Sequence, residues 1–203
     1  MGKEKYQKEI GELFEKSPVV SFDSIERIIK SRKNVKQYAK QLTRNLLKKG
    51  KIKSLAKGYY TSYDESSLAV FCFKPAYLGL QDALSFYEFW EQETIPIIIT
   101  SRKVRQGIRK IMGMNVLIRR IDKKCLFGFE YQKQGNFFLP YSDIEKTFID
   151  MVYFNEKISE EAKENIIKII NKKKLNLYLK RYAKKFRKRV LSCLWAGCAN
   201  HPG

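Results

Sequence analysis

The sequence contains a single histidine and no long apolar run. His201 is one of the last three residues, so the body of the chain cannot build a histidine-dependent catalytic triad or a multi-histidine metal site. The longest apolar stretches, around residues 70–73 and 97–99, fall far short of the roughly 20 residues that a membrane helix needs. The start of the sequence is too charged for a signal peptide and lacks the residue that myristoylation requires at position 6. We therefore expect a cytoplasmic protein without a membrane partner.

Cysteines are few, and none belongs to a recognisable metal pattern. Cys72 and Cys125 lie in apolar runs and are expected to be small core residues. Cys193, Cys198 and His201 lack a fourth ligand, and their spacing matches no common zinc motif. We expect no metal and no cofactor.

Negative charge is scarce and unevenly distributed. The chain has 41 Lys and Arg against 21 Asp and Glu, a net charge of +20. Residues 1–60, 101–125 and 166–203 carry net charges of +10, +8 and +11, and the two segments between them carry −5 and −4. This patterned charge favours nucleic acid, an anionic membrane surface or an acidic protein as the partner.

The first 62 residues predict three helices followed by a β-hairpin. Apolar residues recur at helical spacing over residues 3–16, a short second helix follows Ser21 or Asp23 as its cap, and a third covers residues 35–49. Two short alternating runs, residues 51–55 and 59–61, flank a Lys-Gly turn. This order is typical of a winged helix-turn-helix DNA-binding domain, which we assign to residues 1–62.

The outer face of the third predicted helix carries hydrogen-bond donors and no acid. Amide side chains pair with adenine edges, arginine with guanine and lysine with phosphate, so such a face suits the major groove of DNA. The alternative is an ordinary lysine-rich solvated face, but residues 30–63 contain no acidic residue at all. The expected DNA contacts are Asn34, Lys36, Gln37, Lys40, Gln41, Arg44 and Lys48 on or beside the helix, with Lys51, Lys53 and Lys57 on the hairpin.

Residues 63–203 predict a mixed α/β domain with a small sheet and a C-terminal helical region, which makes the whole chain α+β. We expect strands over residues 68–73, 95–100, 115–121, 125–131 and 136–139, with Pro140 ending the sheet. Helices are expected over residues 78–90, 142–154 and 159–170. Ser142 and Glu145 have the spacing of a capping box at the start of the second of these.

The last basic block predicts one amphipathic helix over residues 175–190. Three interpretations remain open: the helix packs on the domain with a solvated basic face, extends the DNA footprint, or lies on a membrane, the last being the weakest. Together with the basic stretch after residue 100, it defines a second basic surface: Arg102, Lys103, Arg105, Arg109, Lys180, Arg181, Lys184, Lys185 and Lys188.

Glu145, Lys146 and Asp150 are the residues that most resemble a nuclease site. A restriction-type site needs an acid and a downstream Glu-x-Lys on a strand, whereas Glu145 and Lys146 are adjacent on a predicted helix. An internal ion pair on a capped helix is the better interpretation. We expect no catalytic residue and no enzymatic activity.

Several segments resemble the AbiEi-type abortive-infection antitoxins, a family of winged-helix transcriptional regulators. Residues 77–87 (YLGLQDALSFY) are similar to the family's "aYisleSALsyhgL" helix, and a strand and a basic segment follow them, as in the family. Phe127-Gly128-Phe129 is similar to "fFGy", residues 142–150 (SDIEKTFID) to "aspEKAllD", and Gly58-Tyr59-Tyr60 to "rGvY". These segments occur in the family's order across residues 10–155.

The resemblance implies a sequence-specific regulator that binds double-stranded DNA at its own promoter, with inverted repeats as a suitable operator. It also implies an autorepressor joined to an antitoxin domain, residues 63–203, whose partner is a nucleotidyltransferase-like toxin encoded alongside it. Two other functions remain open: a protein-interaction antitoxin module that binds an acidic toxin, and an RNA-binding protein, because no motif separates duplex DNA from structured RNA.

Overall fold

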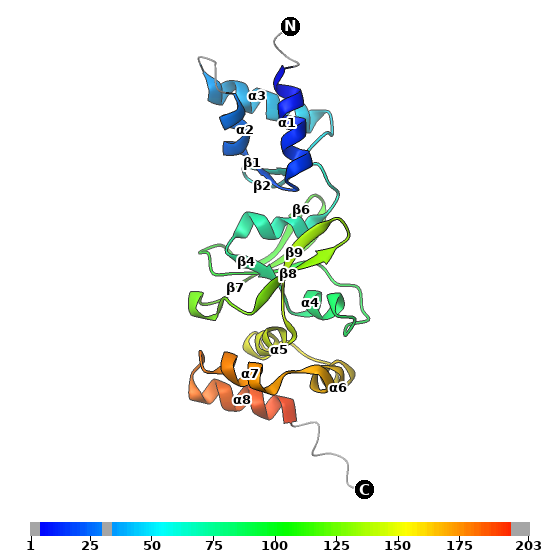
Figure 1. Cartoon of the computed structure of the whole chain (residues 1–203), viewed down its shortest axis with the longest axis vertical. Helices are drawn as coiled ribbons and strands as arrows, with labels where there is room; N and C mark the ends of the chain where they lie inside the picture. Colours follow the sequence, from blue (N-terminus) through cyan, green and yellow to red (C-terminus); the bar gives the residue numbers. More distant parts are fainter. Residues whose placement is uncertain (1–4, 30–33, 196–203) are drawn as a thin grey trace. The chain divides into compact units, whose positions relative to one another are not determined.

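The computed structural model describes residues 5–29 and 34–195, and the protein is of the mixed α+β class expected from the sequence (Figure 1). Two compact units are present. The first comprises Met1–Cys72 together with Arg109–Val116, and the second comprises Phe73–Ile108 and Leu117–Gly203. The sequence predicts a domain boundary between residues 62 and 63.

Up to residue 61, the described part of the first unit contains three α-helices and a three-stranded antiparallel sheet. The helices are α1 (Lys5–Lys16), α2 (Phe22–Ile28) and α3 (Val35–Lys48), and the strands are β1 (Val20–Ser21), β2 (Lys53–Ala56) and β3 (Tyr59–Thr61) in the order β1-β3-β2. The expected hairpin is β2–β3, whereas β1 was not anticipated. Ser21 caps α2 by accepting a hydrogen bond from the Ser24 backbone, which decides between the two expected caps. The apolar faces of the three helices share one core, in which Ile10, Ile25 and Ala39 are fully buried.

Six strands from the middle of the sequence form a mixed sheet. Its strands are β4 (Ala76–Leu78), β5 (Ile97–Thr100), β6 (Gly107–Ile111), β7 (Met114–Arg120), β8 (Phe129–Gln134) and β9 (Phe137–Ser142), in the order β6-β7-β5-β4-β9-β8. β5 pairs in parallel with β7 and antiparallel with β4, and all four of its residues are buried. The β-branched run around residues 97–100 is therefore a central buried strand, as the sequence predicted.

Among the described residues, five α-helices belong to the second unit and share its core. They are α4 (Gln81–Phe86), α5 (Ile144–Tyr153), α6 (Glu160–Ile169), α7 (Lys172–Leu179) and α8 (Lys184–Trp195). α5 lies between the sheet and the α7–α8 pair (Figure 1), and all but the last of its ten residues are buried. Polar side chains of α5 that a surface helix would expose to water are consequently enclosed here.

Three predicted elements between residues 68 and 131 were wrong. The apolar run at residues 68–73 was expected to be a strand, but it lies in η1, a 3₁₀ helix (Ser66–Phe73). The helix expected over residues 78–90 begins only at Gln81 and ends at Phe86, since β4 takes the residues before it. Cys125, expected in a strand, ends the 3₁₀ turn η2 (Lys123–Cys125).

Three predicted boundaries were wrong as well. Pro140 does not end the sheet but lies inside β9. Asp143 is the N-cap of α5, accepting a hydrogen bond from the Lys146 backbone at 2.8 Å, so Ser142 and Glu145 form no capping box. The single basic helix expected over residues 175–190 is divided into α7 and α8 by a turn at residues 180–183.

Candidate nucleic-acid interface

α3 buries one face and presents the other to solvent. Ala39, Leu42 and Leu46 are buried in the first unit's core, and Tyr38 meets the ring of Tyr6 edge-on at 5.9 Å. Every helix residue expected to contact DNA is exposed: Asn34, Lys36, Gln37, Lys40, Gln41, Arg44 and Lys48. The structure thus brings the expected donors together on one solvent-facing surface.

The start and the middle of this surface differ in their hydrogen bonds. Asn34 adopts a left-handed conformation (φ 68°) and makes no side-chain cap bond, while its carbonyl accepts hydrogen bonds from the amides of Gln37 and Tyr38. Further along α3, Gln41 donates a side-chain hydrogen bond to Asn45 at 3.1 Å, which orients the two amides on the outer face.

The three hairpin lysines have different surroundings. Lys53 forms an ion pair with Asp64, so its charge is already matched within the protein. Lys51 is exposed just before β2, and Lys57 is exposed at the turn between β2 and β3. Only Lys57 joins the α3 lysines: Lys36, Lys40 and Lys57 line one cavity of about 470 Å³, with Asp23 as the acid in its lining.

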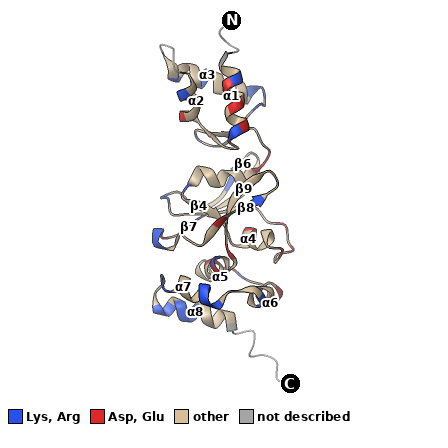
Figure 2. Ribbon diagram, viewed as in Figure 1, with Lys and Arg blue, Asp and Glu red and all other residues tan. Residues whose placement is uncertain are grey.

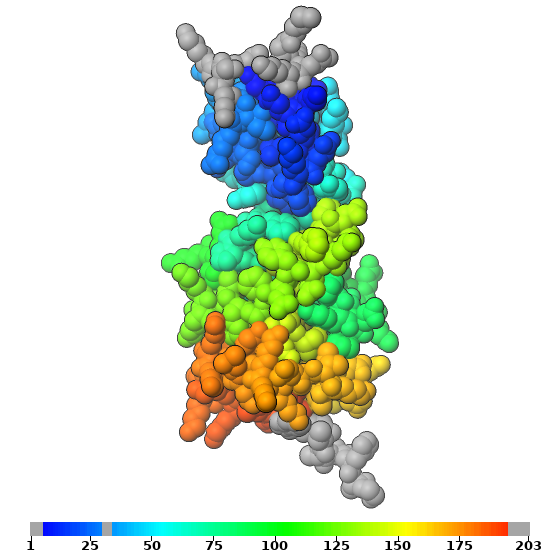
Figure 3. Space-filling view, viewed as in Figure 1, coloured from blue at the N-terminus to red at the C-terminus, as the bar shows by residue number. Residues whose placement is uncertain are grey.

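The second basic surface divides into two groups on different elements. Arg102, Lys103 and Arg105 are exposed in the loop after β5, and Arg109 is half-buried in β6. The second group lies on the α7–α8 turn and on α8 (Figure 3), a part of the ribbon with many Lys and Arg positions (Figure 2). That group comprises Lys180, Arg181, Lys184, Lys185 and Lys188, all of them exposed.

The apolar face of α7–α8 packs on the domain, as one of the three interpretations expected. Leu175, Leu179, Tyr182 and Val190 are buried in the core of the second unit. Arg181 lies 4.3 Å from the centroid of the Phe127 ring, so the ring holds its guanidinium in place. The basic side of the pair is exposed to solvent.

A buried polar network connects α5 to β4 and α7. Lys146 and Asp150 form a fully buried ion pair, and the Tyr77 hydroxyl donates to Asp150 at 2.7 Å. The internal ion pair predicted on this helix is therefore confirmed between Lys146 and Asp150. Burial raises the pKa of the Asp150 carboxyl, and the charge of Lys146 counteracts that rise. Burial also raises the pKa of Tyr77 well above its usual value, with the Asp150 charge adding to the effect.

Residues that sequence reasoning did not connect complete this network. Lys174 of α7 contacts Asp143 at 3.1 Å and Glu145 at 3.3 Å, and the Tyr178 hydroxyl donates to Asp143 at 2.7 Å. Burial and the hydrogen bond to Asp143 raise the pKa of Tyr178 to about 12. Burial lowers the pKa of Lys174, but the two carboxylates outweigh it and the net shift is upward. The carboxylates thus hold α7 on the start of α5.

Two of the segments that carry the family resemblance meet in this network. Gly128 has φ 69°, and a Cβ placed there would come within 2.9 Å of both the Lys146 and the Tyr178 side chains. The Lys146 ammonium lies 5.2 Å from the centroid of the Phe127 ring. The Phe-Gly-Phe and Glu-Lys segments are therefore packed against each other, and only glycine fits between them.

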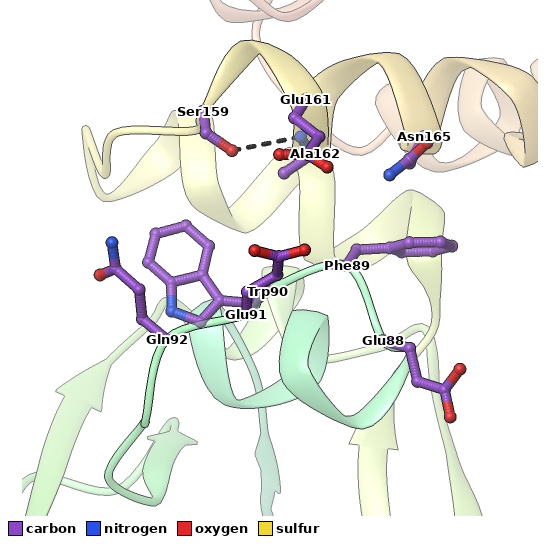
Figure 4. Close-up of a pocket in the computed structure, with 9 residues that line it drawn as sticks. All are labelled: Glu88, Phe89, Trp90, Glu91, Gln92, Ser159, Glu161, Ala162 and Asn165. Atoms are coloured by element: carbon purple, nitrogen blue, oxygen red, sulfur yellow. Dashed lines mark hydrogen bonds between the residues drawn. The ribbon is translucent and has the colours of Figure 1, made fainter.

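The second unit also contains a cavity of opposite character. It has a volume of about 240 Å³ and lies between the loop at residues 88–92 and the start of α6 (Figure 4). Glu88, Glu91 and Glu161 surround it beside the Trp90 indole. These carboxylates repel phosphate, so the cavity is no part of a nucleic-acid interface.

Neither a cluster of metal-ligating side chains nor a membrane-spanning helix is found among the described residues. Within residues 5–29 and 34–195, no group of His, Cys, Asp and Glu side chains is arranged to hold a metal ion. In the same part of the chain, every helix is too short or too polar to cross a bilayer. Cys198 and His201, considered above as ligands, lie outside the described residues.

Comparison with known proteins supports the fold alone. No protein-family model matches the chain, and neither does any curated protein sequence. The RV2827C protein from Mycobacterium tuberculosis has a similar crystal structure, with a TM-score of 0.60, covering 91% of this chain and 73% of that protein. The two sequences are 11% identical. At this level of identity, the likeness establishes a shared α+β architecture.

Proposed function

We propose that the chain is a sequence-specific transcriptional regulator that binds double-stranded DNA through a winged helix-turn-helix in its first unit. The observation that carries this proposal is the outer face of α3, where seven exposed residues offer amide, guanidinium and ammonium donors and no acid. The order of three helices and a hairpin in the first unit supports it, because that order lets α3 enter a major groove beside a β-turn.

The reading residues in this proposal are Gln37, Gln41 and Arg44. Two amides and a guanidinium on one helix face are suited to adenine and guanine edges, and each good bidentate pair discriminates by about 1–3 kcal/mol. Asn34 and Lys48 lie at the two ends of this face. Lys51 is placed to reach a flanking phosphate.

The test compares binding to the chain's own promoter region, random duplex DNA and duplex RNA in one gel-shift series. We expect the promoter duplex to bind most tightly, and replacement of Gln41→Ala together with Arg44→Ala to remove most of that preference. Lys8→Ala, an exposed charge on α1, is the control and should keep the preference. Equal losses on promoter and random DNA in the double variant would show that α3 does not read sequence. Tighter binding to duplex RNA would replace DNA as the partner.

We further propose that the regulator represses its own promoter and serves as the antitoxin to a nucleotidyltransferase-like toxin. The AbiEi resemblance supports this role, since Phe127, Gly128 and Lys146 from two resembling segments pack together. A pulldown from nuclease-treated lysate should recover the product of the neighbouring gene. Recovery of one acidic protein, with no DNA binding in the gel-shift series, would instead favour a protein-interaction module.

A further inference from the structure

α3 carries two parallel rows of donors, and the structure separates them. Lys36 and Lys40 are one helical turn apart and both line the 470 Å³ cavity. Gln37, Gln41 and Arg44 form the neighbouring row and are not part of its lining. The sequence predicts all five residues as DNA contacts on one helix face, whereas the geometry gives the two lysines a different environment.

The rest of the cavity lining comes from the hairpin turn and the start of α2. Lys57, Gly58, Tyr59 and Tyr60 line it together with Phe22 and Asp23. The amide of Phe22 donates to the Gly58 carbonyl at 2.7 Å, which ties the turn to α2. Gly58 has φ 80°, and its missing side chain would lie 3.9 Å from the Phe22 Cβ, so the turn and α2 are closely apposed. Lys57 therefore projects from an anchored turn, next to the Lys36–Lys40 row.

We propose that Lys36, Lys40 and Lys57 form a preorganised clamp for one backbone phosphodiester of the bound DNA. This inference rests on the proposed function and deepens it, because it assigns Lys36 and Lys40 to the backbone and leaves base reading to Gln37, Gln41 and Arg44. The lining contains three lysines and one aspartate, so its net charge is positive and complements a phosphate. The aromatic residues in the wall suit the sugar beside it.

The anchored turn explains why the clamp would set the register of α3. Lysine side chains lose rotamer freedom when they bind, and a fixed turn reduces the remaining ordering cost. Phosphate contacts fix the position of a protein on the duplex, and base contacts then specify the sequence. A phosphate held between α3 and the turn would place the Gln37–Arg44 row at one defined depth in the groove.

The first experiment follows the backbone amides of the full ¹⁵N-labelled chain during titration with the dinucleotide dTpdT. We expect shifts at Lys36, Lys40 and Gly58, and none at Lys51 or Lys53. The matched variant Asp23→Asn should bind dTpdT more tightly, and Lys57→Ala should abolish the shifts at Lys36. Shifts spread evenly over the exposed lysines would overturn the clamp. Mononucleotide dTMP binding a hundredfold more tightly than dTpdT would also overturn it, because the cavity would then be a nucleotide site.

The second experiment uses promoter duplexes that carry one neutral methylphosphonate at each successive position. Lys57→Ala should weaken binding to the unmodified duplex about five- to tenfold at 0.1–0.15 M salt and reduce the salt slope by about 0.9. On the duplex whose methylphosphonate replaces the clamped phosphate, Lys57→Ala should cause no further loss of affinity, because the contact between Lys57 and that phosphate is already lost. Equal costs at every position would contradict the clamp.

These readouts separate the two proposals. Localised dTpdT shifts without any promoter preference would support the clamp and contradict the regulator. Promoter preference with no methylphosphonate position coupled to Lys57 would support the regulator and contradict the clamp.

Discussion

Residues of α5 show that contacts between sequence neighbours can be predicted, whereas contacts between distant parts of the sequence cannot. The Lys146–Asp150 pair is four residues apart on one helix, so the sequence alone indicates it. Glu145 was considered with them, but it accepts a hydrogen bond from the amide of Asn171 at 2.8 Å and contacts Lys174. Those partners lie 26 and 29 residues away in the sequence, and no local spacing encodes them.

Replacing Lys146→Met should destabilise the second unit strongly. The substitution leaves the Asp150 carboxylate fully buried without its cation, which costs about 3–5 kcal/mol of unfolding free energy. Adding Asp150→Asn should recover part of the loss, because the amide oxygen still accepts from Tyr77 and no charge remains. Urea denaturation followed by tryptophan fluorescence measures this, since both tryptophans belong to the second unit. Lys124→Met, on an exposed ion pair, is the control and should change the free energy by less than about 1 kcal/mol.

Tyrosine ionisation should make the second unit sensitive to alkali. The pKa of Tyr178 is raised to about 12 by burial and by Asp143, and that of Tyr87 is raised to about 12 by burial. A pKa that is higher in the folded state means stability that is complete below pH 10 and is lost between about pH 10 and 12. The thermal midpoint, followed by tryptophan fluorescence, should fall over this window. In Tyr178→Phe the fall should be smaller, and an identical fall would contradict the role of Tyr178.

At the level of elements, regular periodicity was predictable and long-range pairing was not. α3 was expected over residues 35–49 and covers Val35–Lys48, because its apolar residues recur at helical spacing. The apolar run at residues 68–73 has no such period, and a short run of this kind does not distinguish a strand from a buried helical segment. It is the 3₁₀ helix η1.

Pro140 illustrates a different limit at the same scale. β8 and β9 are joined by a two-residue turn, so Gln134 and Phe137 form a hydrogen-bonded pair and the pairs alternate from there. Pro140 faces Tyr131 in a pair that is not hydrogen-bonded, and its missing N–H therefore costs the β8–β9 ladder nothing. The register decides whether proline is tolerated, and the sequence does not reveal the register.

The start of α5 should be more sensitive than an ordinary helix cap. Asp143 accepts the Lys146 amide and the Tyr178 hydroxyl and pairs with Lys174, so it serves both α5 and α7. Asp143→Ala should cost more than the ~1 kcal/mol of a typical cap, whereas Asp143→Asn keeps the cap and should cost less. Ser159→Ala on α6 is the control, since Ser159 caps only its own helix, at 3.2 Å from the Ala162 amide. Equal costs at the two caps, measured by urea denaturation, would show that the contacts to α7 contribute nothing.

Across the whole molecule, the charge of +20 is divided among surfaces of different chemistry. α3 combines lysine with amides and arginine, whereas the exposed side of α8 offers lysine and arginine without amide donors. Ammonium groups attract phosphate regardless of the base sequence, while amides discriminate between bases. In the proposed regulator, the α8 surface would therefore contribute to affinity and α3 to specificity.

If the two surfaces have these different roles, two sets of substitutions in the protein should affect DNA binding differently. Lys180→Gln, Lys184→Gln, Lys185→Gln and Lys188→Gln together should weaken binding to promoter and random duplexes by the same factor, leaving their ratio unchanged. The slope of log affinity against log salt should become shallower by about 0.9 for each phosphate contact removed. The Gln41→Ala and Arg44→Ala pair should instead reduce the ratio, because it removes contacts to bases. Fluorescence anisotropy at several salt concentrations measures both quantities. An unchanged slope in the fourfold variant would mean that α8 stays in solvent, and a changed ratio would mean that α8 itself reads sequence.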